Sequence, residues 1–412
     1  MPVFSIPLSG LTASSTALSA IANNLANLNT VGYKESKATF RDLFYQTLGT
    51  TGGGDPIQVG AGTAVGSMAT RFAPGSVDTT GVPTDVAIMG DGFFVVEKDG
   101  LPQYTRAGNF QVGTDGYLRT QNDQLVMGYP AQAGQVQLNG ALAPLQLGKG
   151  QISPPSATAS LQARVNLDAT SDVGDTFSTH ITTYDSLGDS HVVTLKFDKA
   201  AQNSWNYQVT LPAADTGATG NDTVLKSGTL TFDGSGHLTA PAADVTGIAI
   251  SGLANGAADM TFTWKLLDES GVAMVTQMAS ASDTASTQQD GFSSGTLQDF
   301  TIGSDGVIQG SFSNEKTLVL GQVALANFAN VQGLTRVGNN DYTATLASGE
   351  GVVGAPGTGG RGALAGGALE LSNVDIAQEF AQMILAQRGY EANARAVTTF
   401  DEITQDTINL KR

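Results

Sequence analysis

Three histidines, His180, His191 and His237, are the side chains in this 412-residue chain best suited to acid-base chemistry. A nucleophilic site would require one of them to meet a serine and an acidic residue. None lies in a nucleophile-elbow or zinc-helix pattern, and around His191 the residues alternate with apolar positions. We therefore interpret the histidines as strand or turn residues. The chain has no cysteine, which excludes disulfides, zinc-thiolate sites and thiol nucleophiles.

Two glycine-rich motifs resemble ligand-binding loops but lack essential parts. The segment 90–92 (Gly-Asp-Gly) has no third glycine and precedes a short apolar run instead of a helix, so a turn entering a strand is favoured over a phosphate loop. The segment 233–236 lacks the remaining acidic ligands of a calcium loop and is interpreted as a hairpin turn. We predict that the protein is not an enzyme and has no cofactor, catalytic residue or metal site.

The charge balance limits the partners. With a net charge of −17 and only 20 Lys and Arg, the chain lacks the basic stripe that phosphate neutralisation requires, so nucleic acid is excluded as a partner. No stretch approaches the roughly 20 apolar residues needed to span a bilayer. Residues 1–5 show no start of a signal peptide. We expect no membrane insertion, and export by a route without a cleaved signal.

Apolar residues in the segment 9–28 repeat at spacings of seven, three, four and three, which predicts a helix with a coiled-coil-like seam interrupted at Ser14. The other positions carry small polar residues, so this helix needs a partner to be stable. The seam consists of Leu11, Leu18, Ile21, Leu25 and Leu28.

The C-terminal segment predicts a second, longer helix over about 373–410. Ser372 and Asp375 have the spacing of a capping box, and Asp375 with Glu379 favours the positive start of the helix. At 1.5 Å per residue this helix would be roughly 57 Å long, which favours projection from the body. Its apolar face contains Ile376, Phe380, Met383, Ile384, Tyr390 and Val397.

We predict that the two helices form a polymerisation domain, 1–30 and 370–412, whose apolar residues contact other copies. The alternative, in which the two helices pair only with each other, stays open. Glycine-rich stretches at 49–66 and 351–367 lie just inside the helices and have the low stiffness that a hinge requires. The predicted hinge residues, within linkers 31–75 and 351–369, are Gly52, Gly53, Gly54, Gly359 and Gly360.

Between these linkers the apolar pattern changes to a period of two, as in 191–197 and 261–266, which predicts half-buried strands. Four Asp-Gly pairs, at 99, 115, 233 and 305, predict hairpin turns. Pattern breaks at 151–156 and 280–290 suggest crossings between domains. The predicted fold is mainly β, with two nested antiparallel β domains and paired terminal helices in a coiled-coil-like stalk. The inner domain comprises 76–150 and 290–350, and the outer domain 151–289 is inserted into it.

Several motifs resemble those of the axial proteins of the bacterial flagellum, the family of rod, hook and hook-associated proteins. The start signature of the family resembles the segment 20–34. A segment shared by hook and rod proteins resembles 90–96 together with 104–110 and 116–118, and the family's ending resembles 371–375 together with 387–393. The resemblance is weakest over 200–280. The residues of the start signature are Asn23, Asn24, Asn27, Gly32, Tyr33 and Lys34.

The segment 183–188 and the size of the inserted domain favour a hook subunit over a distal rod subunit. The resemblance implies a helical homopolymer, a curved tube that acts as a flexible coupling and transmits torque from rod to filament. It also implies export by the flagellar type III apparatus to an extracellular position. Implied partners are the distal rod protein, the hook-filament junction protein and the hook cap protein. A distal rod subunit and a β-rich cell-surface protein that binds glycan or acts on peptidoglycan remain as alternatives.

Overall fold

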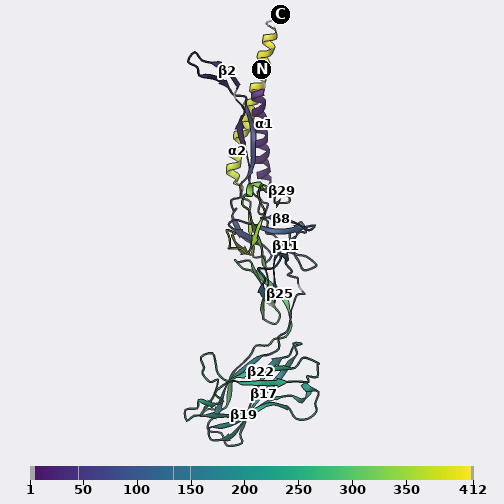
Figure 1. The fold of residues 1–412 in the computed structure, drawn as a ribbon, viewed down its shortest axis with the longest axis vertical. Helices are drawn as coiled ribbons and strands as arrows, with labels where there is room; N and C mark the ends of the chain where they lie inside the picture. The colour runs from purple at the N-terminus through teal and green to yellow at the C-terminus, as the bar shows by residue number, and fades with distance from the viewer. Residues whose placement is uncertain (1–4, 45, 133, 149, 410–412) are drawn as a thin grey trace. The chain divides into compact units, whose positions relative to one another are not determined.

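The computed structural model describes residues 5–44, 46–132, 134–148 and 150–409. Contacts divide the chain into two compact units. Unit 1 comprises 1–149, 299–310 and 318–412, and unit 2 comprises 150–298 and 311–317. The chain therefore leaves unit 1 to build unit 2 and then returns (Figure 1).

Two long helices in unit 1 pack against each other: α1, Ser5–Ala26, and α2, Ile376–Asn409. They run antiparallel, because Gly10 lies beside Asn393 while Asn24 lies beside Glu379 (Figure 1). The predicted pairing of the terminal helices is confirmed. Both helices are amphipathic only weakly, since alanine, serine, threonine and asparagine occupy many positions of α1.

A β ribbon lies along α1. Strand β1, Ser36–Asp42, pairs antiparallel with β4, Thr63–Thr70, and the chain between them forms a hairpin of β2, Gln46–Thr50, and β3, Pro56–Val59. The backbone N–H of Thr63 donates to Ser9 Oγ at 3.1 Å, which ties the far end of the ribbon to the start of α1. We call α1, α2, β1 and β4 the stalk. The predicted linker 31–75 contains these four strands, which are mostly exposed and lack a buried apolar alternation.

The remainder of unit 1 is a β body. Its main sheet contains the order β27-β11-β7-β8-β30-β29. Apolar side chains close the interior, among them Val86, Phe94, Leu118 and Leu325, each fully buried. The elements of this body are β5 Val77–Thr79, β6 Val86–Met89, β7 Phe93–Lys98, β8 Leu101–Thr105, β9 Gln111–Val112, β10 Leu118–Arg119, β11 Leu125–Gln132, β12 Gln135–Val136, β13 Ala143–Pro144, β25 Gly295–Ile302, β26 Val307–Phe312, β27 Thr317–Val323, β28 Leu325–Asn327, η2 Val331–Gly333, β29 Thr335–Gly338, β30 Asp341–Thr343, β31 Val352–Gly354, β32 Ala363–Gly366 and β33 Ala368–Glu370, with β25, β26 and β27 crossing the unit boundaries.

Unit 2 contains two five-stranded sheets that share one apolar core. One sheet has the order β16-β17-β18-β19-β20, and the other β21-β22-β15-β23 with β24 paired to β15. Trp205 from the first sheet and Trp264 from the second are both almost fully buried. The elements are β14 Ile152–Ser153, β15 Ser160–Asp168, β16 Thr176–Tyr184, β17 Ser190–Ala201, β18 Ser204–Leu211, η1 Ala213–Thr216, β19 Thr223–Phe232, β20 Leu238–Ala240, β21 Val245–Ile250, β22 Met260–Lys265, β23 Val275–Met278 and β24 Asp283–Gln289.

The mainly β fold with paired helices is confirmed, and so are the local signals in the β regions. Strands β17 and β22 bury every second residue, and each of the four Asp-Gly pairs lies between two consecutive hydrogen-bonded strands. Two features differ from the expectation. Strand β15 pairs parallel with β22 and β23. The polar run 280–290 contains β24, an almost fully exposed strand that carries no alternating signal because it has no apolar face.

Candidate assembly surface and helix-body junction

Small residues make the contact between α1 and α2. A Cβ atom added to Gly10 would lie 2.6 Å from Asn393 Oδ1, and one added to Gly389 would lie 3.4 Å from Ser14 Oγ. The side chains of α1 that are buried in the described structure include Ala13, Ala20 and Ile21. Close approach of the two backbones therefore uses a stripe of small side chains, which a search for large apolar residues overlooks.

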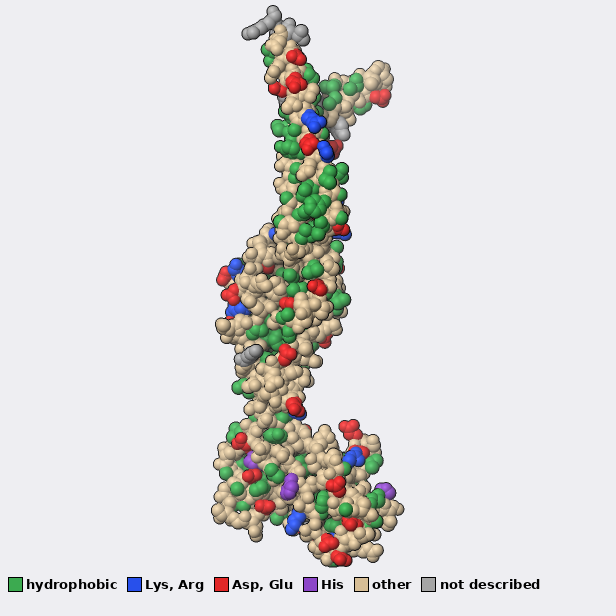
Figure 2. All heavy atoms as spheres, turned by 180° about the vertical axis from the view of Figure 1, so that it is seen from behind, with side chains coloured by type: hydrophobic (Ala, Val, Ile, Leu, Met, Phe, Trp, Pro, Cys, Tyr) green, Lys and Arg blue, Asp and Glu red, His purple; other side chains and the backbone are tan. Residues whose placement is uncertain are grey.

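The predicted apolar interface residues are distributed around this contact. On α1 Ile21 is buried, and Leu11, Leu18, Leu25 and, just after the helix, Leu28 are half-buried. On α2 Met383 and Val397 are half-buried, but Ile376, Phe380, Ile384 and Tyr390 are 51%, 50%, 57% and 42% exposed. Figure 2 shows hydrophobic side chains gathered on the surface of the helical part. The pairing of α1 with α2 thus leaves a row of large apolar side chains without cover within the described chain.

Asn24, near the end of α1, connects three elements of unit 1. Its side chain is 1% exposed and contacts both backbone polar groups of Ser36, donating to the carbonyl at 2.9 Å and accepting from the N–H at 3.0 Å. Its Nδ2 also donates to Glu379 Oε1 of α2 at 3.2 Å, and its Oδ1 accepts from the Tyr33 hydroxyl at 3.2 Å. One amide side chain therefore joins α1, α2 and the start of β1.

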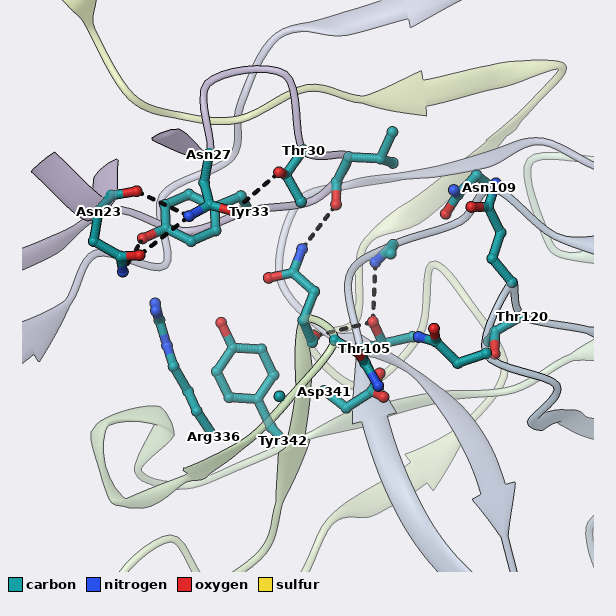
Figure 3. Close-up of a pocket in the computed structure, with 17 residues that line it drawn as sticks. Asn23, Asn27, Thr30, Tyr33, Thr105, Asn109, Thr120, Arg336, Asp341 and Tyr342 are labelled. Atoms are coloured by element: carbon teal, nitrogen blue, oxygen red, sulfur yellow. Dashed lines mark hydrogen bonds between the residues drawn. The ribbon is translucent and has the colours of Figure 1, made fainter. Parts of the chain in front are cut away.

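The other residues of the start signature shape the turn that follows α1. Asn23 donates to the Tyr33 hydroxyl at 3.2 Å, and Asn27 accepts from Thr30 at 3.1 Å (Figure 3). Gly32 has a φ of +66°, and a Cβ there would lie 2.6 Å from the Arg106 carbonyl carbon, so only glycine fits. These side chains border a cleft of about 470 Å³ that is also lined by residues near 336–342 (Figure 3).

A buried ionic cluster connects both chain ends to the β body. Lys34 Nζ lies 2.6 Å from Glu370 Oε1, and Arg106 Nε lies 3.1 Å from Glu370 Oε2. The side chains of Lys34 and Glu370 are 0% exposed and that of Arg106 is 3% exposed. The Arg106 guanidinium also donates to the carbonyls of Gly90 and Gly92, at 2.9 and 2.7 Å. The segments around 34, 106 and 370 are thereby held at one point.

The cluster contains two cations and one anion, and this imbalance shifts the pKa of Lys34. Burial lowers the pKa of Lys34 most, the charge of Arg106 lowers it further, and contact with Glu370 only partly offsets both, so that the pKa falls to about 8. Lys34 also donates to the Ala73 carbonyl at 2.9 Å. The ammonium group therefore has hydrogen-bond partners but remains costly to keep charged.

Two residues that precede α2, Asn373 and Asp375, anchor its start. Asn373 accepts from the backbone N–H of Glu35 at 2.8 Å and donates to the carbonyls of Arg71 and Ala73, at 2.8 and 2.9 Å. Asp375 Oδ1 accepts from the N–H groups of residues 377 and 378, at 2.8 and 3.1 Å. The helix therefore begins at Ile376 with Asp375 as its cap, and the predicted capping box with Ser372 as N-cap is wrong. Asp375 outcompetes Ser372 because its carboxylate reaches the free N–H groups directly.

We call Asn24, Tyr33, Lys34, Arg106, Glu370 and Asn373 the junction. Asn24, Tyr33 and Lys34 are among the predicted family motif residues, whereas the contacts of Arg106, Glu370 and Asn373 were not predicted. Arg106 and Asn373 lie inside segments that resemble the family, which was the available signal. Glu370 had none, because nothing local distinguishes a buried acid from an exposed one.

The predicted hinge glycines lie in two turns of unit 1. Gly52, Gly53 and Gly54 are exposed in the turn that joins β2 to β3, and a Cβ at Gly52 would meet open space. Gly359 and Gly360 lie in the turn between β31 and β32, where the Gly360 carbonyl accepts from Asn327 at 3.3 Å. Whether either turn bends in the assembled protein stays a prediction.

The three histidines do not form a common site. His180 contacts Thr194 Oγ1 at 2.9 Å and is exposed, and His237 lies 3.6 Å from Asp233. His191 is 6% exposed and lies between two carboxylates, 3.1 Å from Asp185 and 3.1 Å from Asp215. Both ring nitrogens face acceptors, so the imidazolium form satisfies both contacts. In the described residues no group of three or more His, Asp or Glu is placed to hold a metal ion.

Comparison with known proteins decides the family. The flagellar hook protein FlgE of Salmonella typhimurium is 35% identical over 99% of this chain and 100% of its own length, and that of Escherichia coli is 33% identical over 99% and 100%. The chain belongs to the flagellar hook protein family. The hook protein of Treponema pallidum is 34% identical over 98% of both chains. The chain is accordingly a structural, non-enzymatic subunit of the hook of the bacterial flagellum, as the sequence analysis predicts.

Three family models match separate parts of this hook protein. The flagella basal body rod protein model covers 6–34, the FlaE D2 domain model of flagellar basal body proteins 105–292, and the C-terminal model of basal body rod FlgEFG proteins 365–410. The crystal structure of Helicobacter pylori flagellar hook protein FlgE2 matches 70% of this chain and 98% of its own, with 15% identity and a TM-score of 0.49. No helix in the described part of the chain is both long and apolar enough to cross a membrane.

Proposed function

We propose that copies of this hook subunit stack into a curved helical tube, in which α1 and α2 form the inner layer and the β regions lie outside. The observation that carries the proposal is the row of uncovered apolar side chains on α2, at Ile376, Phe380 and Ile384. Such a row is costly in water and is covered when a second copy packs against it. A head-to-tail contact that does not close on itself is sufficient to build an open tube.

The energies support assembly as the event that completes the stalk. Burying a whole Ile or Phe side chain contributes about 1.5 to 3 kcal/mol, so covering the exposed half of one contributes about 1 kcal/mol. Several such side chains per copy offset the cost of ordering a helix that small residues stabilise poorly. Free copies therefore gain stability in the stalk only when they meet.

We further propose that the tube is a flexible coupling that transmits torque from rod to filament. The exposed glycines at 52–54 allow the tip of the β2–β3 hairpin to change shape in contact with a neighbouring copy, while the junction keeps the stalk attached to the β body. The proposed partners in the flagellum are the distal rod protein, the hook-filament junction protein, the hook cap protein and the type III export apparatus. An extracellular position belongs to the same proposal.

The test compares polymer formation by the full chain and by variants of the stalk, observed by electron microscopy at high protein concentration. The double substitution Leu18→Asp and Leu25→Asp places charges on half-buried positions of α1 and is expected to abolish polymers. Val173→Asp, at a position 69% exposed in unit 2, is the control and is expected to polymerise. Polymer formation by the double variant at the wild-type concentration contradicts the stalk as the assembly surface. Straight, rigid polymers of the wild-type chain would contradict the proposed curved tube.

A fragment of residues 31–374 refines the test. It lacks both helices but retains Lys34, Arg106, Glu370 and Asn373, so the ionic cluster and the Asn373 bridges remain. We expect the fragment to stay monomeric while unit 2 unfolds as in the full chain. A cut that also removed Glu370 would leave Lys34 and Arg106 buried without an anion and would confuse lost assembly with lost folding.

A further inference from the structure

Glu379 on α2 is a buried acid with one oxygen that lacks a partner. The residue is 2% exposed, and its Oε1 accepts from Asn24 at 3.2 Å. Its Oε2 is buried and has no hydrogen-bond partner in the described structure. A buried carboxylate oxygen without a donor is costly, which makes this atom a place where a donor from outside would be stabilising.

Glu379 is among the residues that line a groove between α1, α2 and β1, which we call the Glu379 groove. Its volume is about 300 Å³. Small and apolar side chains form most of its walls, and its rim carries two large apolar side chains, Leu385 at 72% and Phe40 at 45% exposed. Its lining residues include Lys37, Phe40, Glu379, Gln382 and Leu385.

The charged groups around Glu379 do not supply the missing donor. Lys37 lines the groove but is exposed and makes no hydrogen bond to Glu379 among the described contacts. Glu35, 5% exposed, is nearby and pairs with Arg71 at 3.5 Å. Burial and, to a smaller extent, the charge of Glu35 raise the pKa of Glu379, although the Asn24 hydrogen bond acts in the opposite direction. The groove is therefore a largely apolar channel with a buried acid among its lining residues.

Such a channel fits the side chain of an arginine. The alkyl part can lie along apolar walls while the guanidinium reaches the carboxylate. Helix α2 carries two arginines: Arg388 pairs with Glu391 at 3.3 Å, whereas Arg395 is exposed and makes no ion pair among the described residues. One unpaired cation and one unpaired acid oxygen therefore occur on the same helix.

We propose that the Glu379 groove of one copy receives Arg395 of a second copy, so that assembly supplies the donor that Glu379 lacks. The inference rests on the proposed self-assembly and names a contact within it. Arg395 lies 16 positions after Glu379, about 24 Å along the helix axis and about 160° around it. When two copies are shifted by about 24 Å along the stalk, the groove of one copy therefore lies at the level of Arg395 of the other. Because the groove and Arg395 lie on different faces of the helix, the contact is head-to-tail and can be repeated from copy to copy.

Disulfide trapping tests the contact directly, because the chain has no native cysteine. The full-length double variant Gln382→Cys with Arg395→Cys places one thiol in the lining of the groove and one at the arginine position. Thirteen positions on one helix separate them by about 20 Å, so they cannot bond within one chain. In two copies shifted by about 24 Å the two thiols lie within about 5 Å of the same level along the stalk, and oxidation of the polymer is expected to produce a ladder of covalent oligomers. The matched control, Gln382→Cys with Asp406→Cys, leaves its thiols about 12 Å from the same level and is expected to give no ladder.

Polymerisation thresholds give an independent measure. Glu379→Gln keeps the oxygen that accepts from Asn24, and Arg395→Gln alters an exposed position, so neither is expected to change the melting of the monomer. Each is expected to raise the critical concentration for polymerisation about tenfold, and the double variant no more than either single one. Arg388→Gln, on the same outward side, is the control and is expected to leave the threshold within about twofold.

The outcomes separate this inference from the proposed function. A ladder specific to the 382 and 395 pair, with non-additive thresholds, supports the contact. Equal ladders in both cysteine variants, no ladder in either, or additive thresholds in polymers that otherwise form normally would overturn the contact and leave self-assembly standing. Failure of the wild-type chain to polymerise would overturn both.

Discussion

The stalk and unit 2 differ in how far they bury their large apolar side chains. Unit 2 covers the large apolar side chains of its core completely: Leu195, Phe197 and Trp264 are each 0% exposed. The stalk uses small residues for its own helix contact and leaves side chains such as Phe380 and Ile384 at 50% and 57% exposure. Unit 2 is therefore built to be stable by itself, while the stalk is built to be completed by another surface.

The difference shows where folding ends and assembly begins in this chain. A residue that contributes to folding is buried in the single copy, whereas a residue that contributes to assembly remains exposed in it. The junction belongs to the first kind, since its charged side chains are buried although the neighbouring helices are not fully covered. Three experiments test this division.

A matched pair of phenylalanine substitutions tests the comparison most strongly. Phe197→Ala is expected to destabilise unit 2 by about 3 to 5 kcal/mol, because it leaves a cavity in a fully packed core. Phe380→Ala is expected to change the stability of the monomer by less than about 1 kcal/mol but to raise the polymerisation threshold. Both tryptophans, Trp205 and Trp264, lie in unit 2, so tryptophan fluorescence during urea unfolding follows that unit selectively. A large loss of monomer stability in Phe380→Ala would show that the stalk is a closed fold.

The junction is expected to depend on Glu370. Glu370→Gln removes the anion between Lys34 and Arg106 and is expected to cost about 3 to 5 kcal/mol in the unfolding of unit 1 below pH 8. In the wild-type chain the pKa of Lys34 is lowered from 10.5 to about 8. Between pH 8 and pH 10.5 the unfolded chain therefore binds more protons than the folded chain, so Lys34 makes the free energy of unfolding rise with pH. Circular dichroism of urea unfolding at several pH values measures both effects, and Glu391→Gln on the surface of α2 is the control. A variant as stable as wild type would show that the cluster is not needed.

The smallest expected effect is a pH dependence confined to unit 2. Burial by itself would lower the pKa of His191, but hydrogen bonds to Asp185 and Asp215 prevail and raise it above 6.5. The stabilisation from this contact is therefore complete below pH 6.5 and is lost as the pH rises through the folded pKa. His191→Gln is expected to cost about 1 to 3 kcal/mol at pH 6 and to remove this slope, while His180→Gln retains it. If the pH dependence of the stability of unit 2, measured by tryptophan fluorescence, is unchanged in His191→Gln, the charged contact of His191 with Asp185 and Asp215 is contradicted.

Much of the local structure could be predicted from the sequence, because the deciding interactions lie within a few residues. The alternation in β17, the Asp-Gly turns and the two helices follow from the spacing of apolar residues and from turn chemistry. The start of α2 was misplaced by about a turn because Ser372 and Asp375 both fit a cap, and only backbone geometry shows that Asp375 is used. Strand β24 was missed because its two faces are equally polar.

The sites depend on contacts between distant parts of the chain, and these were predicted least. Lys34 was recognised as a motif residue, but its burial against Glu370, 336 positions later, has no local signal. The acid of the Glu379 groove looked like an ordinary residue of a first helical turn. It is buried because Asn24 of α1 lies against it, which the antiparallel arrangement of the helices decides.

By itself the sequence determined the classes of structure present: terminal helices that cannot be stable alone, a β body with hairpin turns, an acidic surface without cysteine, and motifs of an axial protein. These follow from composition and short-range spacing. Only the tertiary structure decided which face of each helix is used, since the small residues near Gly10 and Gly389 take the inner contact and leave the large apolar residues outside. The physical reason is that close helix packing favours small side chains, so the residues that mark a helix as amphipathic remain available for a second copy.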